Sequence, residues 1–139
     1  APPKDVKQLV TALRDILTAL VALHKLKLMH RDLRWDNVLK YQHDRDEWFL
    51  IDFDEGASAP AAHGALHLDS TSHAPEIALS HSVKVDIWGV GYLLRTTTVL
   101  NLPHELDTIR EQCLQKNPAK RPTASSLLKA VQNLLMALA

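Results

Sequence analysis

The sequence predicts an α+β fold that is mainly α-helical, a helical bundle accompanied by one or two small β-hairpins. Stretches at 4–25 and 123–138 carry apolar residues at helical spacing, and 83–94 is apolar on nearly all sides of a helix. Only short extended pieces lie between them. The chain has 139 residues, 46% of them hydrophobic, which is enough for the core of one domain. We therefore expect a single domain over residues 1–139.

The first predicted helix covers residues 4–25. Its apolar residues recur at i, i+3, i+4 and i+7, while most of its charged and amide residues fall between them. Pro2 and Pro3 stand just outside its start, where proline is tolerated. One face of this helix is therefore expected to be buried.

Short extended segments are predicted next in the chain. Residues 28–29 form the first, and residues 38–41 and 48–51 form a hairpin across the polar connection 42–47. Residues 54–73 contain Gly, Ala, Ser, His and Pro without periodicity, which predicts a loop.

The second half of the chain is predicted to be helical. Residues 75–80 are expected to form one helical turn, 83–94 a buried helix that weakens at the threonines 96–98, and 103–115 a further helix. Asn117-Pro118 is expected to end that helix, and Thr123 to cap the last one.

Composition excludes several classes of function. Sixteen basic and sixteen acidic residues cancel, and no long basic run suggests nucleic acid or an anionic membrane as a partner. No apolar run approaches the ~20 residues of a membrane span. A single cysteine, Cys113, excludes an internal disulfide. With no signal-peptide pattern at its start, the chain is expected to be cytoplasmic, and the missing Met suggests a fragment or a processed chain.

A series of short motifs carries the strongest functional signal. Residues 30–37 have the pattern H-R-D-L-x-x-x-N, and they are followed by D-F-D at 52–54, A-P-E at 74–76, D-I-W-G at 86–89 and R-P-T at 121–123. A lone Asp in such a stretch usually marks a turn or a helix cap. The ordered series resembles the C-terminal lobe of protein kinases, in a divergent, fungal-type form with D-F-D in place of D-F-G.

The resemblance implies roles in phosphoryl transfer from ATP with Mg²⁺. Asp32 would accept or orient the proton of a substrate hydroxyl, and Asn37 and Asp52 would hold Mg²⁺ through oxygen atoms. Arg34 stands where serine/threonine kinases usually have a lysine at the γ-phosphate, and Leu39 would lie beneath the adenine ring.

Other matches imply structural roles. Asp86 is expected to bond backbone amides of the His30 loop, and Glu76 to form a buried pair with Arg121. His30 and Phe53 match the apolar stack between the two kinase lobes. Leu39 and Phe53 have the alternative of being plain core residues.

Arg31 matches an arginine that receives an activation-loop phosphate in the family. The possible acceptors here are the hydroxyl residues Ser58, Ser70, Thr71 and Ser72. Ordinary loop residues are the alternative, and it is the preferred one.

The eight histidines raise the possibility of a metal site. His63 and His67 are four residues apart and His73 is near, a spacing that suits zinc only on a helix. The segment lacks helical periodicity and a suitable carboxylate or thiol, so a metal site there is not favoured.

Three departures from the kinase pattern limit the expected activity. No Gly-rich loop, strand lysine or helix glutamate of the N-terminal lobe occurs in this sequence, so the chain alone is expected to have negligible kinase activity. Asp54 replaces a glycine that the motif uses in switching. Only residues 99–103 separate two predicted helices where a kinase has an additional docking helix.

Two functions therefore stand side by side. The chain is either part of an ATP- and Mg²⁺-dependent serine/threonine-type kinase that acts on a protein substrate, or a pseudokinase-like binding module. The second follows from apolar surface around Phe53, Leu39 and the first helix, which is expected to bind a protein partner or a second copy of the chain.

Overall fold

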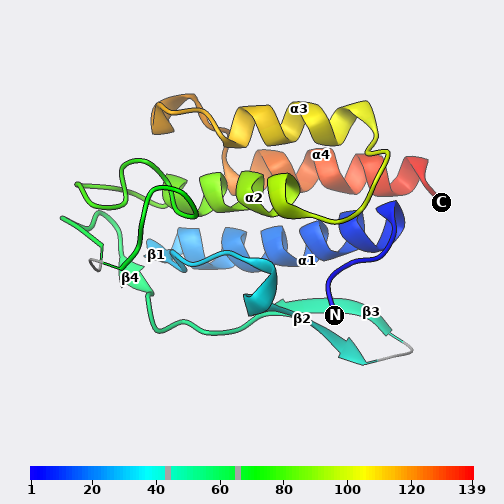
Figure 1. The fold of residues 1–139 in the computed structure, drawn as a ribbon, viewed down its shortest axis with the longest axis horizontal. Helices are drawn as coiled ribbons and strands as arrows, with labels where there is room; N and C mark the ends of the chain where they lie inside the picture. The colour runs from blue at the N-terminus through cyan, green and yellow to red at the C-terminus, as the bar shows by residue number, and fades with distance from the viewer. Residues whose placement is uncertain (43–44, 65–66) are drawn as a thin grey trace.

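The computed structural model describes residues 1–42, 45–64 and 67–139. A helical layer is formed by α1 (Val6–Lys25), α2 (Lys84–Thr96), α3 (His104–Cys113) and α4 (Ala124–Ala137). Two small antiparallel sheets, β1 with β4 and β2 with β3, complete the fold. In Figure 1 the helix axes run in nearly the same direction, and β2 and β3 lie below α1. The predicted fold class, α+β and mainly helical, is confirmed.

Helix α1 is the central element of the core. Asp5 caps it by accepting a hydrogen bond from the backbone N–H of Gln8 at 2.8 Å, so the helix begins at Val6, two residues later than predicted. Its buried face packs against α4 and β3. Each fully buried leucine there stabilises the fold by roughly 1.5–3 kcal/mol. The completely buried apolar residues of α1 are Leu9, Val10, Ala12, Leu13, Ile16, Leu17 and Leu20.

The hairpin consists of β2 (Val38–Gln42) and β3 (Arg45–Leu50). Trp48 and Leu50 are buried in the core shared with α1, whereas Phe49 between them is 40% exposed. This alternation is that of a strand with one covered face. The second strand begins at Arg45 rather than at Trp48 as predicted, because Arg45 still pairs with Gln42 across the hairpin. Residues 43–44 of the predicted connection lie outside the described residues.

Strand β1 (Leu28–Met29) pairs with β4 (Ala57–Ser58). Strand β4 lies in residues 54–73, which were predicted to form a loop throughout. A two-residue strand is too short to show an alternating pattern. Residues 65–66 of that predicted loop lie outside the described residues. The described parts of 54–80 gather at the end of the molecule where β1 and β4 meet (left in Figure 1).

The predicted helical turn at 75–80 is wrong. Ile77 and Leu79 donate to the carbonyls three residues before them, at 3.0 and 2.9 Å, which gives isolated turns and no helix. The carbonyl of Ile77 instead accepts from the N–H of Gly64 at 2.8 Å. The bond from Gly64 therefore satisfies the Ile77 carbonyl, which in a helix would accept from a later residue of the same helix.

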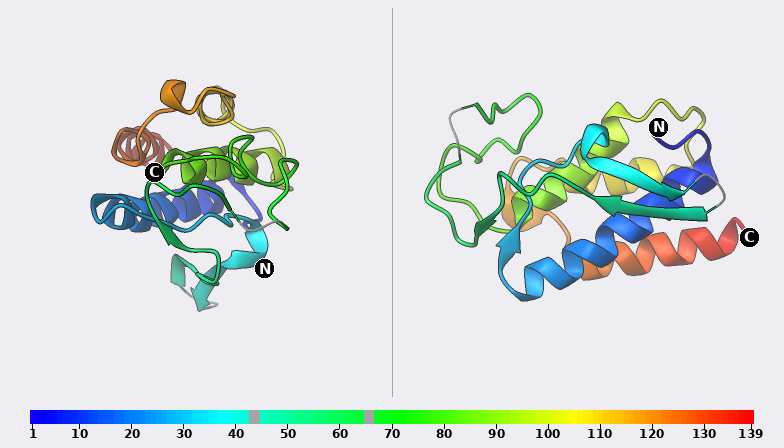
Figure 2. Two further views of the ribbon diagram at one scale, coloured as in Figure 1. Left: turned by 90° about the vertical axis from the view of Figure 1, so that its left-hand side faces the viewer. Right: turned by 90° about the horizontal axis from the view of Figure 1, so that it is seen from below.

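The last three helices follow the prediction closely. Helix α2 ends at Thr96, within the predicted threonine run, and α3 begins at His104 and ends at Cys113. Thr123 caps α4 by accepting from Ser126 N–H at 3.1 Å. Two short 3₁₀ turns are present as well, η1 (Trp35–Asn37) and η2 (Pro118–Lys120). Helix α4 packs along α1 and α3 packs against α2 (Figure 2).

Close packing sets the spacing between α2 and α3. A methyl group on Gly91 would come within 2.7 Å of Leu114 Cγ, so only glycine permits this approach. Burial of Cys113 at the same contact raises the pKa of its thiol to about 12. Within the described ranges, no helix is both long and apolar enough to cross a membrane.

Candidate active site

The loop that carries Asp32 is held from α2 by a buried carboxylate. Asp86 accepts from His30 N–H at 2.9 Å and from Arg31 N–H at 2.8 Å. Its Oδ2 also lies 2.9 Å from His24 Nε2, at the end of α1. Asp86 is 1% exposed, so these bonds replace the water that the carboxylate loses. The predicted contact of Asp86 is present, whereas the contribution of His24 was not predicted.

His30 connects the two motifs of the site. Its Nδ1 accepts from Asp32 N–H at 3.1 Å, so Nε2 carries the proton and donates to the carbonyl of Ile51 at 2.9 Å. The ring is completely buried and meets Phe53 edge to face, with centroids 4.8 Å apart. His30 thereby positions both the residue that precedes Asp52 and the Asp32 backbone.

Asn37 brings Asp32 and the D-F-D segment together. Its Nδ2 donates to the carbonyl of Asp32 at 2.8 Å and to Asp32 Oδ2 at 3.2 Å. Its own carbonyl accepts from Ile51 N–H at 2.9 Å, which fixes the residue directly before Asp52. Asp32, Asn37 and Asp52 are thus arranged at the same end of the hairpin.

Asn37 and Asp52 have the chemistry of magnesium ligands. Both hydrogen bonds of the Asn37 amide nitrogen go to Asp32, so its oxygen is turned away from that residue and is available as a hard ligand. Asp52 is exposed and has a positive φ of 60°. Magnesium is typically bound by one or two protein groups together with substrate phosphates. These two residues fit that requirement. Over the described part of the chain, no group of three or more His, Cys, Asp or Glu side chains is placed to hold a metal.

Asp54 takes part in a tight turn after Asp52. Its N–H donates to Asp52 Oδ1 at 3.4 Å, and its φ is not positive. The strained backbone position in this motif is therefore Asp52 rather than Asp54. The expected effect of replacing glycine by Asp54 on switching stays a prediction.

Three further predicted site residues lie on the open side. Arg34 Nη2 is 3.4 Å from Asp36 Oδ2, and its side chain is 48% exposed. Leu39 is 38% exposed and Phe53 is 49% exposed, so the alternative that both are plain core residues is wrong. Leu39 pairs with Phe49 across the hairpin, on the face turned away from α1.

Arg31 is engaged with backbone and histidine groups. It has a φ of 70°, and its Nε donates to the carbonyl of Glu55 at 2.5 Å. Its Nη1 contacts the carbonyl of His63 and His81 Nε2, both at 3.3 Å. These donors tie the Asp32 loop to the segment after D-F-D. The role of Arg31 as a phosphate receptor stays a prediction.

The suggested phosphorylation sites surround Asp69. Its Oδ1 accepts from the N–H and hydroxyl of Thr71, at 3.0 and 2.6 Å, and from the N–H and hydroxyl of Ser72, both at 3.2 Å. These bonds, with the Thr71 hydroxyl as the largest cause, lower the pKa of Asp69 to about 2. Ser70 is exposed beside them, and Ser58 lies in β4.

His73 is the site residue that sequence reasoning missed. Its Nε2 lies 2.9 Å from Asp32 Oδ1, although the sequence suggested it only as a disfavoured metal ligand. His67, also weighed as a ligand, instead contacts Glu55 Oε1 at 2.7 Å. The one available signal was the place of His73 directly before the A-P-E motif, which resemblance alone did not connect with Asp32.

A buried ion pair closes the far end of this segment. Arg121 donates to both carboxylate oxygens of Glu76, at 2.6 and 2.9 Å, and also to the carbonyls of Gln115 and Lys84 at 2.8 and 3.0 Å. Arg121 is 2% exposed, so the predicted buried pair is present, and the structure adds that the contact is bidentate. Lys84 Nζ in turn donates to the Arg121 carbonyl, and burial lowers the Lys84 pKa.

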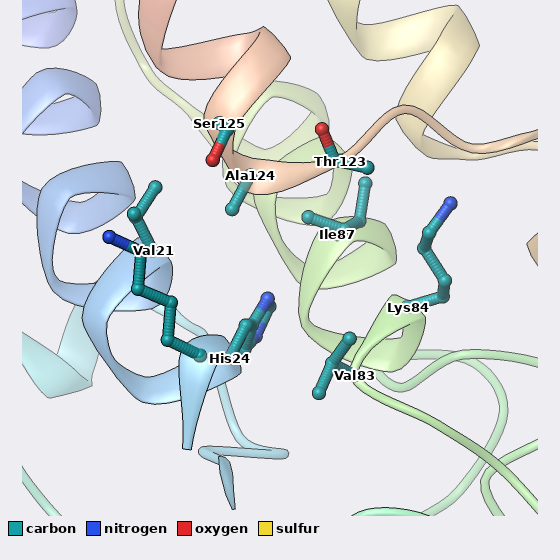
Figure 3. Close-up of a pocket in the computed structure, with 9 residues that line it drawn as sticks. Val21, His24, Val83, Lys84, Ile87, Thr123, Ala124 and Ser125 are labelled. Carbon is teal, nitrogen blue, oxygen red and sulfur yellow. The ribbon is translucent and has the colours of Figure 1, made fainter. Parts of the chain in front are cut away.

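A separate cavity of about 230 Å³ lies where α1 ends and α2 and α4 begin (Figure 3). Apolar side chains such as Val21, Ile87 and Ala124 line it, together with His24 and Lys84. None of the predicted site residues is among its lining residues. The cavity therefore adjoins the Asp86 support through His24 but is not part of the candidate active site.

The family model described as "Protein kinase domain" matches residues 3–111. This chain belongs to the protein kinase family. Complete kinases of this family use ATP and Mg²⁺. Family membership agrees with the resemblance of residues 30–37 and 52–54 to kinase motifs, while the roles of Asp32, Asn37 and Asp52 in this chain stay predictions.

Curated relatives agree with this assignment. The chain is 39% identical to Crinkler effector protein 8 of Phytophthora infestans, over 91% of the chain and 22% of that protein. It is 31% identical to a membrane-associated tyrosine- and threonine-specific cdc2-inhibitory kinase of Drosophila melanogaster, over 84% of the chain and 27% of the kinase. Identity to germinal center kinase 3 of Caenorhabditis elegans is 28%, over 90% of the chain and 28% of that kinase. The chain thus spans between 22% and 28% of the length of these relatives.

Proposed function

We propose that residues 1–139 act as the C-terminal lobe of a serine/threonine-type protein kinase and supply the catalytic-base and metal half of a site for phosphoryl transfer from ATP. The observation that supports this most directly is the pair of bonds from Asn37 Nδ2 to Asp32, at 2.8 and 3.2 Å. They orient a candidate base and a candidate metal ligand relative to each other. Phosphoryl transfer depends mainly on such positioning and on neutralising the phosphate charge.

Each residue has a distinct task in this proposal. Asp32 orients the substrate hydroxyl and accepts its proton as the new bond to phosphorus forms. Asn37 and Asp52 would hold Mg²⁺, which neutralises phosphate charge when it is bound. Arg34, exposed at the rim, is free to swing toward the transferred phosphate, although its present contact is with Asp36. The preference for serine and threonine rests on the charged residue at this position.

The proposal includes low activity for this chain by itself. Asp52, Phe53 and Leu39 are open to water on the side where a nucleotide would lie. Electrostatic stabilisation of phosphate charge is weaker in water than in a closed site of low dielectric. We expect negligible transfer to a serine-containing peptide in a radiolabelled assay, and robust turnover would contradict this expectation.

Calorimetric titration with ATP and Mg²⁺ tests the half-site directly. Binding that requires Mg²⁺, is lost in Asp52→Asn and is kept in Asp54→Asn would support it. Asp54→Asn is the matched control because it removes the same charge only two residues from Asp52, at a side chain with no assigned ligand role. Absence of binding at millimolar nucleotide would contradict the proposal.

A binding module is the second candidate, favoured by one surface. We define the hairpin face as the exposed apolar residues Leu39, Tyr41 and Phe49 together with Phe53, which follows β3 in the chain. Tyr41 and Phe49 meet edge to face with centroids 6.3 Å apart, which makes the surface continuous along the hairpin. Exposed apolar patches of this kind mark interaction sites. The expected occupant is a protein partner or a second copy of the chain.

Light scattering over a range of concentrations tests that second function. A mass that rises with concentration in the unchanged chain, and no longer does so in Phe49→Ser, would support it. A monomer at all concentrations would leave self-association without support. Phe49 suits this test because it is 40% exposed and its neighbours in β3, Trp48 and Leu50, keep the core intact.

A further inference from the structure

The Asp32 carboxylate is engaged at both of its oxygens by groups of the same chain. His73 Nε2 lies 2.9 Å from Oδ1, and Asn37 Nδ2 lies 3.2 Å from Oδ2. The side chains of His73 and Asp32 are only 9% and 17% exposed. A base takes a proton only from a hydroxyl within about 2.6–3.2 Å, so the imidazole occupies the space that a substrate needs at Oδ1.

The imidazole is also held from behind. His73 Nδ1 lies 3.1 Å from the Asp69 carbonyl and 3.1 Å from the Ser72 hydroxyl. The same two residues belong to the turn in which Asp69 Oδ1 collects the donors of Thr71 and Ser72. The position of the ring on Asp32 is therefore set by the Asp69–Ser72 turn.

From this geometry we infer that His73 is a cap on the catalytic base, and that a substrate hydroxyl reaches Asp32 only after the Asp69–Ser72 turn withdraws the ring. The inference rests on the proposed function, since a cap has meaning only if Asp32 acts on a hydroxyl. His73 is a positioning residue in this account, and it does not contact the transferred phosphate.

The hydroxyl groups of the Asp69–Ser72 turn suggest that phosphorylation would release His73 from Asp32. Phosphate on Thr71 or Ser72 would bring a charge of about −1.5 to −2 against the Asp69 carboxylate that now accepts the hydroxyl. Like charges at this distance repel, so the turn would open. Arg95 stands ready to attract the phosphate, because its Nη2 donates to the Thr71 carbonyl at 2.9 Å. Its guanidinium is stacked over Trp88 and Tyr92, with 5.3 Å to each ring centroid.

Carboxylate labelling tests the cap without nucleotide. The chain is treated with a water-soluble carbodiimide and glycine ethyl ester, and labelling rates are read for each residue by peptide mass spectrometry. His73→Ala is expected to raise the Asp32 rate roughly tenfold, the size expected for loss of one charge-assisted hydrogen bond. His67→Ala is the matched control, because His67 also contacts a carboxylate, that of Glu55, but its side chain is 70% exposed and its described contacts do not include Asp32. An unchanged Asp32 rate in His73→Ala would overturn the inference.

Asp86 reports whether the variant is folded. At 1% exposure it should stay unlabelled in every variant with an intact core. If Asp86 becomes labelled in His73→Ala, that variant is not intact, and the inference is tested in the unchanged chain by comparing proton exchange at His73 and His67. The Nε2 proton of His73 should then exchange with water much more slowly than that of His67 in imidazole nitrogen–proton spectra. Equal exchange rates would overturn the inference.

The release step has its own pair of variants. Thr71→Glu should raise Asp32 labelling in the direction of the His73→Ala result, whereas Ser70→Glu should not, because the described donors to Asp69 come from Thr71 and Ser72. Equal effects of the two would contradict the release mechanism. Failure of nucleotide binding would count against the proposed function. Because labelling requires no ATP, the labelling rates would still test the contact of His73 with Asp32.

Discussion

The two sides of the candidate site differ in how the chain supports them. On the Asp32 side, a buried carboxylate anchors the loop, because Asp86 on α2 accepts from the backbone N–H groups of His30 and Arg31. On the Asp52 side, Asp52, Phe53 and Leu39 face water. Under the proposed function, the half of the site that would handle the substrate hydroxyl is held by the core of this chain, whereas the half that would meet the nucleotide is open to water at the hairpin face.

The largest effect should come from the buried pair behind the anchored side. Arg121→Leu strands the Glu76 carboxylate, and we expect the free energy of unfolding to fall by about 3–5 kcal/mol. Urea unfolding followed by tryptophan fluorescence measures this change, since Trp48 and Trp88 are both buried.

Arg110→Leu is the matched control for that experiment. The pair of Arg110 and Asp107 is 3.1 Å apart but 32% and 43% exposed, so its loss should cost no more than about 0.5 kcal/mol. Similar losses in the two variants would mean that burial does not set the strength of these pairs and would remove the contrast between anchored and open regions.

Asp86→Asn should have the next largest effect. An amide keeps the shape but loses the charge, and its single oxygen can accept from only one of the two N–H groups, of His30 and Arg31, that the carboxylate now binds. We expect a loss of about 2–3 kcal/mol, the range of hydrogen bonds to charged groups. Hydrogen exchange of the His30 and Arg31 amides should become faster. Asp36→Asn, on an 82% exposed side chain, should leave both measurements unchanged.

These anchored contacts are also the ones that the sequence predicted best. The contacts of Asp86 and of Glu76 with Arg121 follow from fixed motifs, and the helices follow from apolar periodicity that burial then enforces. The short strand β4, the turns at 75–80 and the capping of Asp32 by His73 did not follow. Each depends on a contact between segments far apart in the sequence, such as Gly64 with Ile77, which no local pattern encodes.

On the open side, Phe53→Ala should have a small effect on stability. Phe53 is 49% exposed and its described aromatic contact is the edge-to-face pair with His30, which is worth about 0.5–1.5 kcal/mol. Leu20→Ala, at a completely buried position, should cost about 2–5 kcal/mol in the same urea experiment. A loss for Phe53→Ala as large as that for Leu20→Ala would mean that the open side is as firmly packed as the core.

The smallest effect concerns the Asp69–Ser72 turn, which contacts His73 on the Asp32 side. Hydrogen bonds from Thr71 and Ser72 lower the pKa of Asp69 from 3.8 to about 2. Because the folded pKa is below the unfolded one, the turn is fully supported above pH 3.8 and loses that support as the pH falls through about 2. Carboxyl carbon shifts in an NMR titration should therefore place the Asp69 midpoint well below the ordinary value of 3.8. Thr71→Val, which removes the strongest donor, should move the Asp69 midpoint upward, while Ser70→Ala should not.

If the Asp69–Ser72 turn also holds His73 on Asp32, the Asp32 labelling rate should rise in Thr71→Val as well. A raised Asp69 pKa without faster Asp32 labelling would mean that the turn does not hold His73 in place.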